Sequence, residues 1–252
     1  MSVSKKTRQG QSWRGKVAMV PGLIAFRGEA GDNKPHKHWA HQMVVGLGNP
    51  VEVRVGQACY AGTSLLIPAG TIHQLQTARV LCLYADPTHN ICKTLLPQAM
   101  AQNIPIIKLD GTPGMEQLIQ LNSTDDLQAA LEDFRKTCTC SVSGQDNRFQ
   151  PVVEVLRSEL MHGREPSRTV LAELAHLSSS RFSHWFSEQA GLPFRSYKKW
   201  LKLLLAFELS QSLSLTDAAM TAGFSDQAHF CRAAMEAFGV NSTTIKQLLS
   251  EK

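Results

Sequence analysis

Hydrophobic and polar positions follow different patterns in the two halves of this 252-residue chain. Between residues 17 and 85 the apolar positions form short runs separated by glycine, proline and asparagine: VAMVPGLIAF, HQMVVGL, VEVRV, TSLLIP and VLCLYA. VEVRV alternates apolar and charged residues, which is the pattern of a half-buried strand. We therefore expect a β-rich N-terminal half, built as a sandwich or a barrel.

The second pattern lies between residues 170 and 245, where two segments share one design. Each begins with a short alanine-rich helix (Val170–His176 and Thr216–Ala222), followed by a tight turn of small residues. A second helix with apolar side chains at helical spacing comes next, and each segment ends in a glycine and an apolar residue (Gly191–Leu192 and Gly239–Val240). This layout predicts two helix-turn-helix units, in which the second helix lies in the major groove of DNA.

The second helix of each unit is predicted to bury an aromatic face and to present a small, polar face. The side chains expected in the core are Phe182, Trp185, Phe186, Phe230, Ala234 and Phe238. In the second unit Gln227 and Arg232 face outward, and these two side chain types make bidentate contacts to adenine and guanine. The alternative is an ordinary helical bundle with a solvated face, which two matching copies in tandem disfavour.

Between the two units, residues 194 to about 212 are predicted to form one helix of about 19 residues, roughly 28 Å long. Major-groove faces on one side of a duplex repeat about every 34 Å. A linking helix of this length would therefore present both units to successive turns of the same DNA.

Residues of roughly 146–248 resemble the DNA-binding domain of the AraC/XylS family of bacterial transcription regulators. The resemblance rests on LSSSRFSHWFSEQAGLPFRSYKKWLKL in the first unit and on GFSDQAHFCRAAMEAFGV in the second. It implies double-stranded DNA as a partner, favours a homodimer, and allows contact with RNA polymerase. The base-edge contacts that it implies come from Ser180, Ser183, His184, Gln227, Ala228, His229 and Arg232.

The distribution of charged residues limits which side chains can contact DNA phosphates. The chain has a net charge of +5, but residues 146–252 contain 12 Lys and Arg against 11 Asp and Glu, a net of +1. Attraction to DNA must then come from a local patch, and the best candidates are Arg195, Lys198, Lys199 and Lys202. We assign phosphate contacts to Lys198 and Lys202; a solvated helix end is the alternative.

Four residues of the N-terminal half are candidate metal ligands. His36 and His38 stand at positions i and i+2, so they point to the same face of an extended segment. Gln42 follows four residues after His38, and His73 ends the stretch GTSLLIPAGTIH. Three imidazoles and one oxygen suit a divalent transition metal, with zinc, nickel, iron and manganese all admissible.

These stretches resemble the cupin barrel: GTSLLIPAGTIH matches its second motif closely, and HKHWAHQ approximates its first. The resemblance implies a cupin-like sensing and dimerisation domain. Gln42 stands where that family has an acidic ligand, and Thr77 stands where it has asparagine. The sequence therefore allows two kinds of ligand in this domain, a metal ion and a small organic effector. We expect His41 and His89 at the surface, not among the ligands.

The segment from 88 to 140 has helical patterns. We expect helices at 89–102 and 112–121, and a third that is capped by Ser123 or Thr124 and carries an apolar stripe of Leu127, Leu131 and Phe134. That stripe either covers the barrel or pairs with a second subunit. Ser167 or Thr169 should cap a later helix. The domain boundaries predicted are a basic tail at 1–16, the cupin-like domain at 17–140, a linker at 141–147 and the DNA-binding domain at 148–252.

The whole pattern predicts a two-domain α+β protein, with a cupin-like barrel followed by an all-helical domain. The six cysteines have no CxxC spacing and the chain has no apolar run long enough to span a membrane, so free thiols in the cytoplasm are expected. We predict a transcription regulator controlled by a metal ion or small effector. A ligand-independent DNA-binding dimer and a metal-dependent cupin enzyme are the alternatives. No acid–base constellation accompanies the histidines, so we expect no enzyme.

Overall fold

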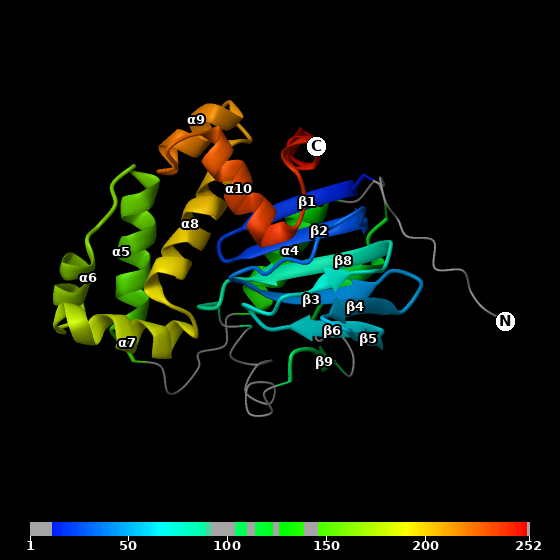
Figure 1. The fold of residues 1–252 in the computed structure, drawn as a ribbon, viewed down its shortest axis with the longest axis horizontal. Helices are drawn as coiled ribbons and strands as arrows, with labels where there is room; N and C mark the ends of the chain where they lie inside the picture. The colour runs from blue at the N-terminus through cyan, green and yellow to red at the C-terminus, as the bar shows by residue number, and fades with distance from the viewer. Residues whose placement is uncertain are drawn as a thin grey trace.

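The computed structural model describes residues 12–89, 91, 104–109, 114–122, 126–138 and 146–250. A β-rich part, made of the described residues up to 138, lies beside a helical part, made of residues 146–250 (Figure 1). The predicted α+β fold of two parts is confirmed. The helix expected at 89–102 and the linker expected at 141–147 fall almost entirely outside the described residues.

The β-rich part contains two antiparallel sheets. The larger has six strands in the order β1 (Arg14–Val20), β2 (Leu23–Glu29), β8 (Arg79–Ala85), β3 (His41–Gly46), β6 (Ser64–Ile67) and β9 (Ile107–Lys108). The smaller has three, in the order β5 (Ala58–Gly62), β4 (Val51–Val55) and β7 (Gln74–Leu75). The first strand begins inside the range predicted as a basic tail at 1–16. Trp13 is buried and Arg14 already pairs with Glu29.

Alternate residues of the larger sheet enter two cores. One set, which includes Val44 and Cys82, packs toward Val53 of the smaller sheet. The other set, which includes Met43 and Leu83, packs on the opposite face. The two sheets therefore enclose a sandwich core, and the described strands show no ladder that joins them into the closed barrel expected from the sequence.

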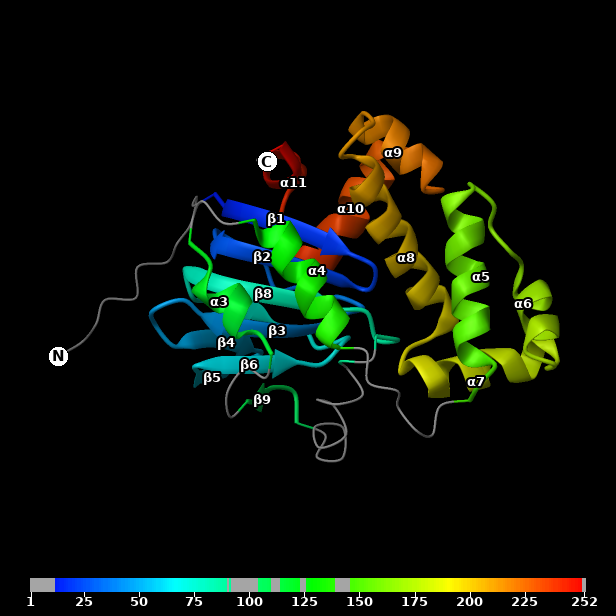
Figure 2. The same cartoon turned by 180° about the vertical axis from the view of Figure 1, so that it is seen from behind.

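Two helices cover the outer face of the larger sheet, α3 (Glu116–Gln120) and α4 (Leu127–Thr137), as Figure 2 shows. The apolar stripe of α4 is buried against the sheet, which confirms the covering role over the pairing one. The predicted cap is wrong: Asp126 caps α4, and its carboxylate accepts from the amides of Gln128 and Ala129 at 2.8 and 3.1 Å. A carboxylate directly before the first turn also suits the positive helix end.

The helical part contains seven helices among its described residues: α5 (Phe149–Met161), α6 (Arg168–Leu174), α7 (Ser179–Ala190), α8 (Phe194–Leu209), α9 (Leu215–Thr221), α10 (Gln227–Phe238) and α11 (Ser242–Ser250). Side-chain caps fix four starts, at Ser167, Ser178, Ser214 and Asp226. Ser167 was one of the two caps expected. Gly191 and Gly239 end α7 and α10 in the left-handed conformation, which glycine adopts without strain.

The predicted packing of the helix-turn-helix units is confirmed. Phe182, Phe186 and Phe230 are fully buried, and Phe238 is half-buried. The linking helix α8 ends at Leu209, earlier than expected, and its 16 residues span about 24 Å. It ends there because Ser210 and the following residues turn toward Ser214, whose hydroxyl caps α9. No helix in the described residues is long and apolar enough to cross a membrane.

A buried polar cluster joins the two parts. Asp86, which follows β8, is fully buried, and its Oδ2 accepts from Nη2 of Arg157 on α5 at 2.9 Å. The hydroxyl of Tyr197 on α8 lies 3.4 Å from the same oxygen. Thr88 donates its amide and its hydroxyl to the other carboxylate oxygen, at 2.8 and 2.6 Å. The helical part is therefore docked on the β-rich part through charged as well as apolar contacts.

Candidate functional site

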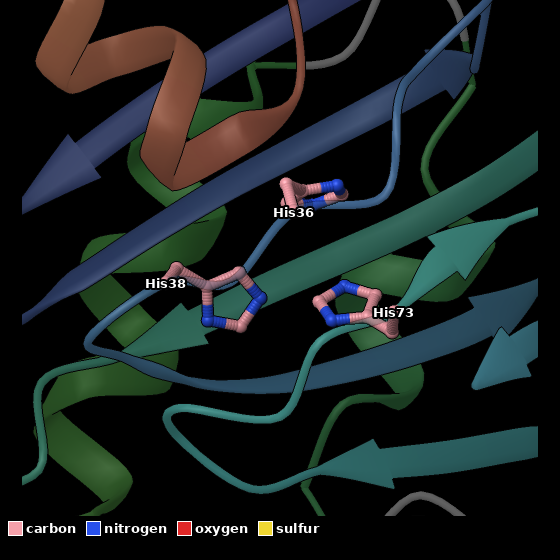
Figure 3. A group of neighbouring side chains, drawn as sticks. All are labelled: His36, His38 and His73. Carbon is pink, nitrogen blue, oxygen red and sulfur yellow. The ribbon is translucent and has the colours of Figure 1, made fainter. Parts of the chain in front are cut away.

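Three histidines meet at the edge of the sandwich core, next to the helical part (Figure 3). His36 and His38 lie on the segment between β2 and β3, and His73 directly precedes β7. An antiparallel bridge joins them: the amide of His36 donates to the carbonyl of His73 at 3.0 Å, and the reverse bond is 2.9 Å. Gly70, with φ +82°, turns the chain after β6 and donates its amide to the carbonyl of His38. The candidate ligand nitrogens lie within 4.8 Å of one another.

Each ring is fixed in the same way. Nδ1 of His36, His38 and His73 lies 2.9, 2.7 and 2.9 Å from a backbone carbonyl two residues away. A carbonyl only accepts, so each Nδ1 must carry the proton. The Nε2 atoms then hold free electron pairs, and a second hydrogen bond that orients a ring in this way is usual for histidine ligands of metals.

Gln42 on β3 joins the cluster as the sequence predicted. Its Oε1 lies 2.8 Å from Nε2 of His38 and 3.1 Å from Nε2 of His73. Its amide nitrogen donates to the Tyr84 hydroxyl at 3.3 Å. With the Nδ1 protons committed to carbonyls, Oε1 and both Nε2 atoms are all acceptors. Two arrangements satisfy them: a cation bound among the three, or a rotated amide whose NH₂ donates to both rings.

Burial keeps these imidazoles neutral. It lowers the pKa of His36 to about 4 and that of His73 to about 2, with the neighbouring His38 adding to both shifts. The pKa of His38 is lowered for the same principal reason. A neutral imidazole is the form that binds a metal, so no proton has to leave at neutral pH.

The two histidines expected at the surface lie elsewhere. His41 is buried, with 8% of its surface exposed, and its Nδ1 accepts from the amide of Ala69 at 3.1 Å. The expectation was wrong because His41 opens β3, where the neighbouring turn covers it. His89 is half-buried and its Nδ1 accepts from the amide of Ile91. The only group of three candidate ligands found among the described residues includes neither of them.

The residues predicted to read DNA bases lie at the start and along the exposed side of α7 and α10. Ser180, His184, Ala228 and Arg232 are exposed. Three others are half-buried and make hydrogen bonds with nearby side chains. The Ser183 hydroxyl accepts from Arg168, the Gln227 amide oxygen accepts from the Thr216 hydroxyl, and Nδ1 of His229 lies 3.2 Å from the Ser225 hydroxyl. Their role in base contacts stays a prediction.

The predicted phosphate-binding lysines have acidic partners. Lys198 and Lys202 both pair with Glu165, and Lys202 also donates to the carbonyl of Gly223 at 3.2 Å. Lys199 pairs with Glu236 at 2.6 Å. The acidic partners come from positions 33 to 37 residues away along the chain, so local sequence gave no sign of them. A phosphate would have to compete with these carboxylates.

Two cavities lie where the parts meet, and the sequence gave no sign of either. A cavity of ≈ 80 Å³ with an almost entirely apolar lining lies between β1, β2 and the last two helices; its walls include Trp13, Phe26, Phe207, Phe238 and Val240. A larger cleft of ≈ 410 Å³ lies between the β1–β2 turn and helices α5 and α8. The first is separated from the histidine cluster by Tyr84, whose ring packs edge-on against His38.

Comparison with known proteins identifies a matching domain family and solved structures with a similar fold. Residues 171–247 match a family model described as a helix-turn-helix domain. The whole chain is similar to ToxT from Vibrio cholerae: an apo variant has a TM-score of 0.59 at 10% identity, covering 92% of this chain and 100% of that chain. ToxT with a bound unsaturated fatty acid has a TM-score of 0.53 at 9% identity, covering 92% and 95%. Comparison with curated protein sequences gives no match.

A transcriptional regulator with an AraC-type DNA-binding domain, from Chromobacterium violaceum, covers 41% of this chain and 93% of its own at 19% identity, with a TM-score of 0.37. At these identities the ToxT likeness shows the fold alone, a β-rich part followed by a helical part.

Proposed function

We propose that this chain, whose residues 171–247 match a helix-turn-helix domain, is a sequence-specific DNA-binding transcription regulator of the AraC type, controlled by a metal ion in its β-rich part. The ligands are Nε2 of His36, His38 and His73, with Oε1 of Gln42 as the fourth. The ion is a divalent transition metal: zinc, nickel, iron or manganese.

One observation carries the metal proposal: three buried, neutral imidazoles bring their candidate ligand nitrogens within 4.8 Å of one another, and the unprotonated Nε2 atoms of His38 and His73 both face the amide oxygen of Gln42. Grouping acceptors in this way is unfavourable unless a donor or a cation lies among them. The carbonyl bonds to the three Nδ1 atoms already fix the rings in the tautomer that binds a metal. The ligand set is neutral, so a divalent ion keeps its full charge in a buried site, and affinity will be moderate compared with a site that includes a carboxylate.

An apolar effector is the second candidate, and the cavity of ≈ 80 Å³ favours it. Helices α10 and α11 provide part of its wall, so an occupant would touch both parts of the molecule. ToxT, which shares the fold, has been seen with an unsaturated fatty acid. The almost entirely apolar lining suits a hydrocarbon chain and offers no charged partner for a head group.

On the DNA side, α7 and α10 are proposed to lie in successive major grooves. Arg232 is exposed on α10 and is the best placed for a bidentate contact to guanine. We also propose a homodimer as the active form, which light scattering of the protein alone and on its DNA would test.

The proposal is tested by measuring metal content and metal affinity on protein purified without an affinity tag. Wild type should bind one equivalent of a divalent transition metal, whereas His38→Ala and His73→Ala should bind none. His89→Ala is the matched control: it removes a half-buried histidine outside the cluster and should retain the metal. Equal binding by wild type and both cluster variants would place the metal elsewhere. Absence of binding in wild type would leave the apolar cavity as the effector site.

A further inference from the structure

The segment from Lys34 to Trp39 carries two of the proposed ligands, and it is also where the helical part touches the cluster. The amide of Lys34 donates to the carbonyl of Gly239, the residue that ends α10, at 3.2 Å. Nζ of Lys199 on α8 lies 4.8 Å from the centre of the Trp39 ring. Tyr84 completes the contact, with its ring edge-on to Phe238 at 5.3 Å.

His36 itself rests on Gly239. A Cβ atom built on that glycine would lie 2.6 Å from Nδ1 of His36 and 2.7 Å from the carbonyl oxygen of Lys34. Both distances are shorter than any van der Waals contact, so only glycine fits. The turn after the second recognition helix therefore packs directly on one imidazole of the cluster.

The spacing of the rings shows that His36 is the histidine that has to move when an ion is bound. Three imidazoles bonded through Nε2 to one tetrahedral ion, with metal–nitrogen bonds of about 2.1 Å, place their ring centres about 5 Å apart. His38 and His73 already have this spacing, at 5.0 Å. His36 does not, because its ring centre is 6.0 Å from that of His38 and 4.4 Å from that of His73.

We propose that metal binding and the docking of α10 oppose one another, with His36 as the residue that connects them. This inference rests on the metal site proposed above and adds how that site is coupled to the DNA-binding helices. In the docked arrangement Gly239 and the Lys34 bond hold His36 away from the tetrahedral position. An ion that draws His36 toward His38 must loosen that contact, so it favours the arrangement in which α10 is released.

Because coupling between two equilibria is reciprocal, an ion that weakens the docking is itself bound more weakly in the docked arrangement. A substitution that loosens the docking should therefore strengthen metal binding. Gly239→Ala provides the perturbation, and the chain offers a matched control in Gly191→Ala. Gly191 ends the first recognition helix with φ +72°, against +69° for Gly239, but a Cβ there would meet nothing within 4 Å. Both variants therefore place an alanine in the left-handed backbone conformation at the same cost in strain. They differ in that the new Cβ of Gly239→Ala would clash with His36.

The experiment is titration of each purified full-length variant with Zn²⁺ in competition with a chromophoric chelator. We expect Gly239→Ala to bind Zn²⁺ about tenfold more tightly than Gly191→Ala, a factor within the usual range for coupled sites. Hydrogen exchange of the Lys34 amide, measured on wild type, should accelerate on addition of Zn²⁺, because that amide bonds across the interface. Equal affinities in the two glycine variants, or an unchanged Lys34 amide, would overturn the coupling.

Lys199→Met keeps the test open if Gly239→Ala fails to fold. It removes the contact with Trp39 together with the ion pair to Glu236 of the helical part. Lys198→Met also removes a lysine with an acidic partner, but both of its partners, Glu165 and the Phe194 ring, lie in the helical part. Lys199→Met should bind Zn²⁺ two- to fivefold more tightly than Lys198→Met, as expected from the size of a cation–π contact. A different result is that His38→Ala abolishes Zn²⁺ binding while neither the two glycine variants nor the two lysine variants differ in Zn²⁺ affinity. That result would reject the coupling and retain the metal site. No Zn²⁺ binding by wild type would reject both.

Discussion

The ion pair between Asp86 and Arg157 should hold the two parts together, and Arg157→Met tests this. The substitution keeps an unbranched apolar stem in place of the aliphatic part of arginine and leaves a fully buried carboxylate without its guanidinium. Breaking a buried pair in this way costs about 3–5 kcal/mol. The Arg157 side chain is 33% exposed, so water screens part of the interaction and we expect about 2 kcal/mol. That corresponds to a change of roughly 30-fold in the docking equilibrium.

The assay is chemical unfolding followed by a probe in each part, with Asp86→Asn and the double variant completing a double-mutant cycle. We expect a coupling of about 1–2 kcal/mol between Asp86 and Arg157. Arg164→Met is the control, because its pair with Glu159 is exposed and lies within the helical part, so it should cost less than about 1 kcal/mol. A cost for Arg157→Met no larger than that of the control would refute the role of this pair.

Three further predictions concern the site and the DNA-reading face. Gln42→Glu should tighten metal binding about tenfold or more, since it adds a negative ligand. If the Gln42 amide is instead rotated and donates hydrogen bonds to the histidine rings, the substitution will destabilise the protein with no gain in metal affinity. In EDTA, the free energy of unfolding should fall as the pH is lowered from 6.5 to 5, by about 1 kcal/mol per pH unit for each buried histidine. The reason is that the unfolded chain takes up protons in this range, whereas burial lowers the pKa of His36 and of His41 to about 4 in the folded protein. Flat urea midpoints over this range would contradict it. Arg232→Ala should weaken binding to a selected DNA site more than to random DNA, as measured by fluorescence anisotropy, and equal losses would exclude base reading.

The spacing of apolar residues predicted the strands and helices because that spacing decides which side chains share a buried face. VEVRV forms β4 with its valines inside, and the aromatic residues of α7 pack as their helical spacing requires. The pair His36 and His38 could be recognised from spacing alone, since i and i+2 share a face of an extended chain. Their meeting with His73 followed from the resemblance to a barrel motif, although the described strands form two sheets without closure.

Contacts between distant segments could not be predicted in this way. The cap of α4 by Asp126 was missed because Ser123 and Thr124 are equally good caps by composition. Glu165 pairs with Lys198 and Lys202 only after α8 folds beside the turn before α6. The contact of Gly239 with His36 joins residues about 200 positions apart, and nothing in either local sequence records it.

The central claim is that an ion at the histidine cluster controls DNA binding, and the most direct measurement is DNA affinity with and without that ion. A binding site is first selected from random DNA with the wild-type protein, and its affinity is then measured by anisotropy at fixed salt, in Zn²⁺ and in EDTA. We predict at least a fivefold difference for wild type and none for the His38→Ala/His73→Ala double variant. Wild-type protein that binds Zn²⁺ at the cluster yet binds DNA equally in both conditions would contradict the account.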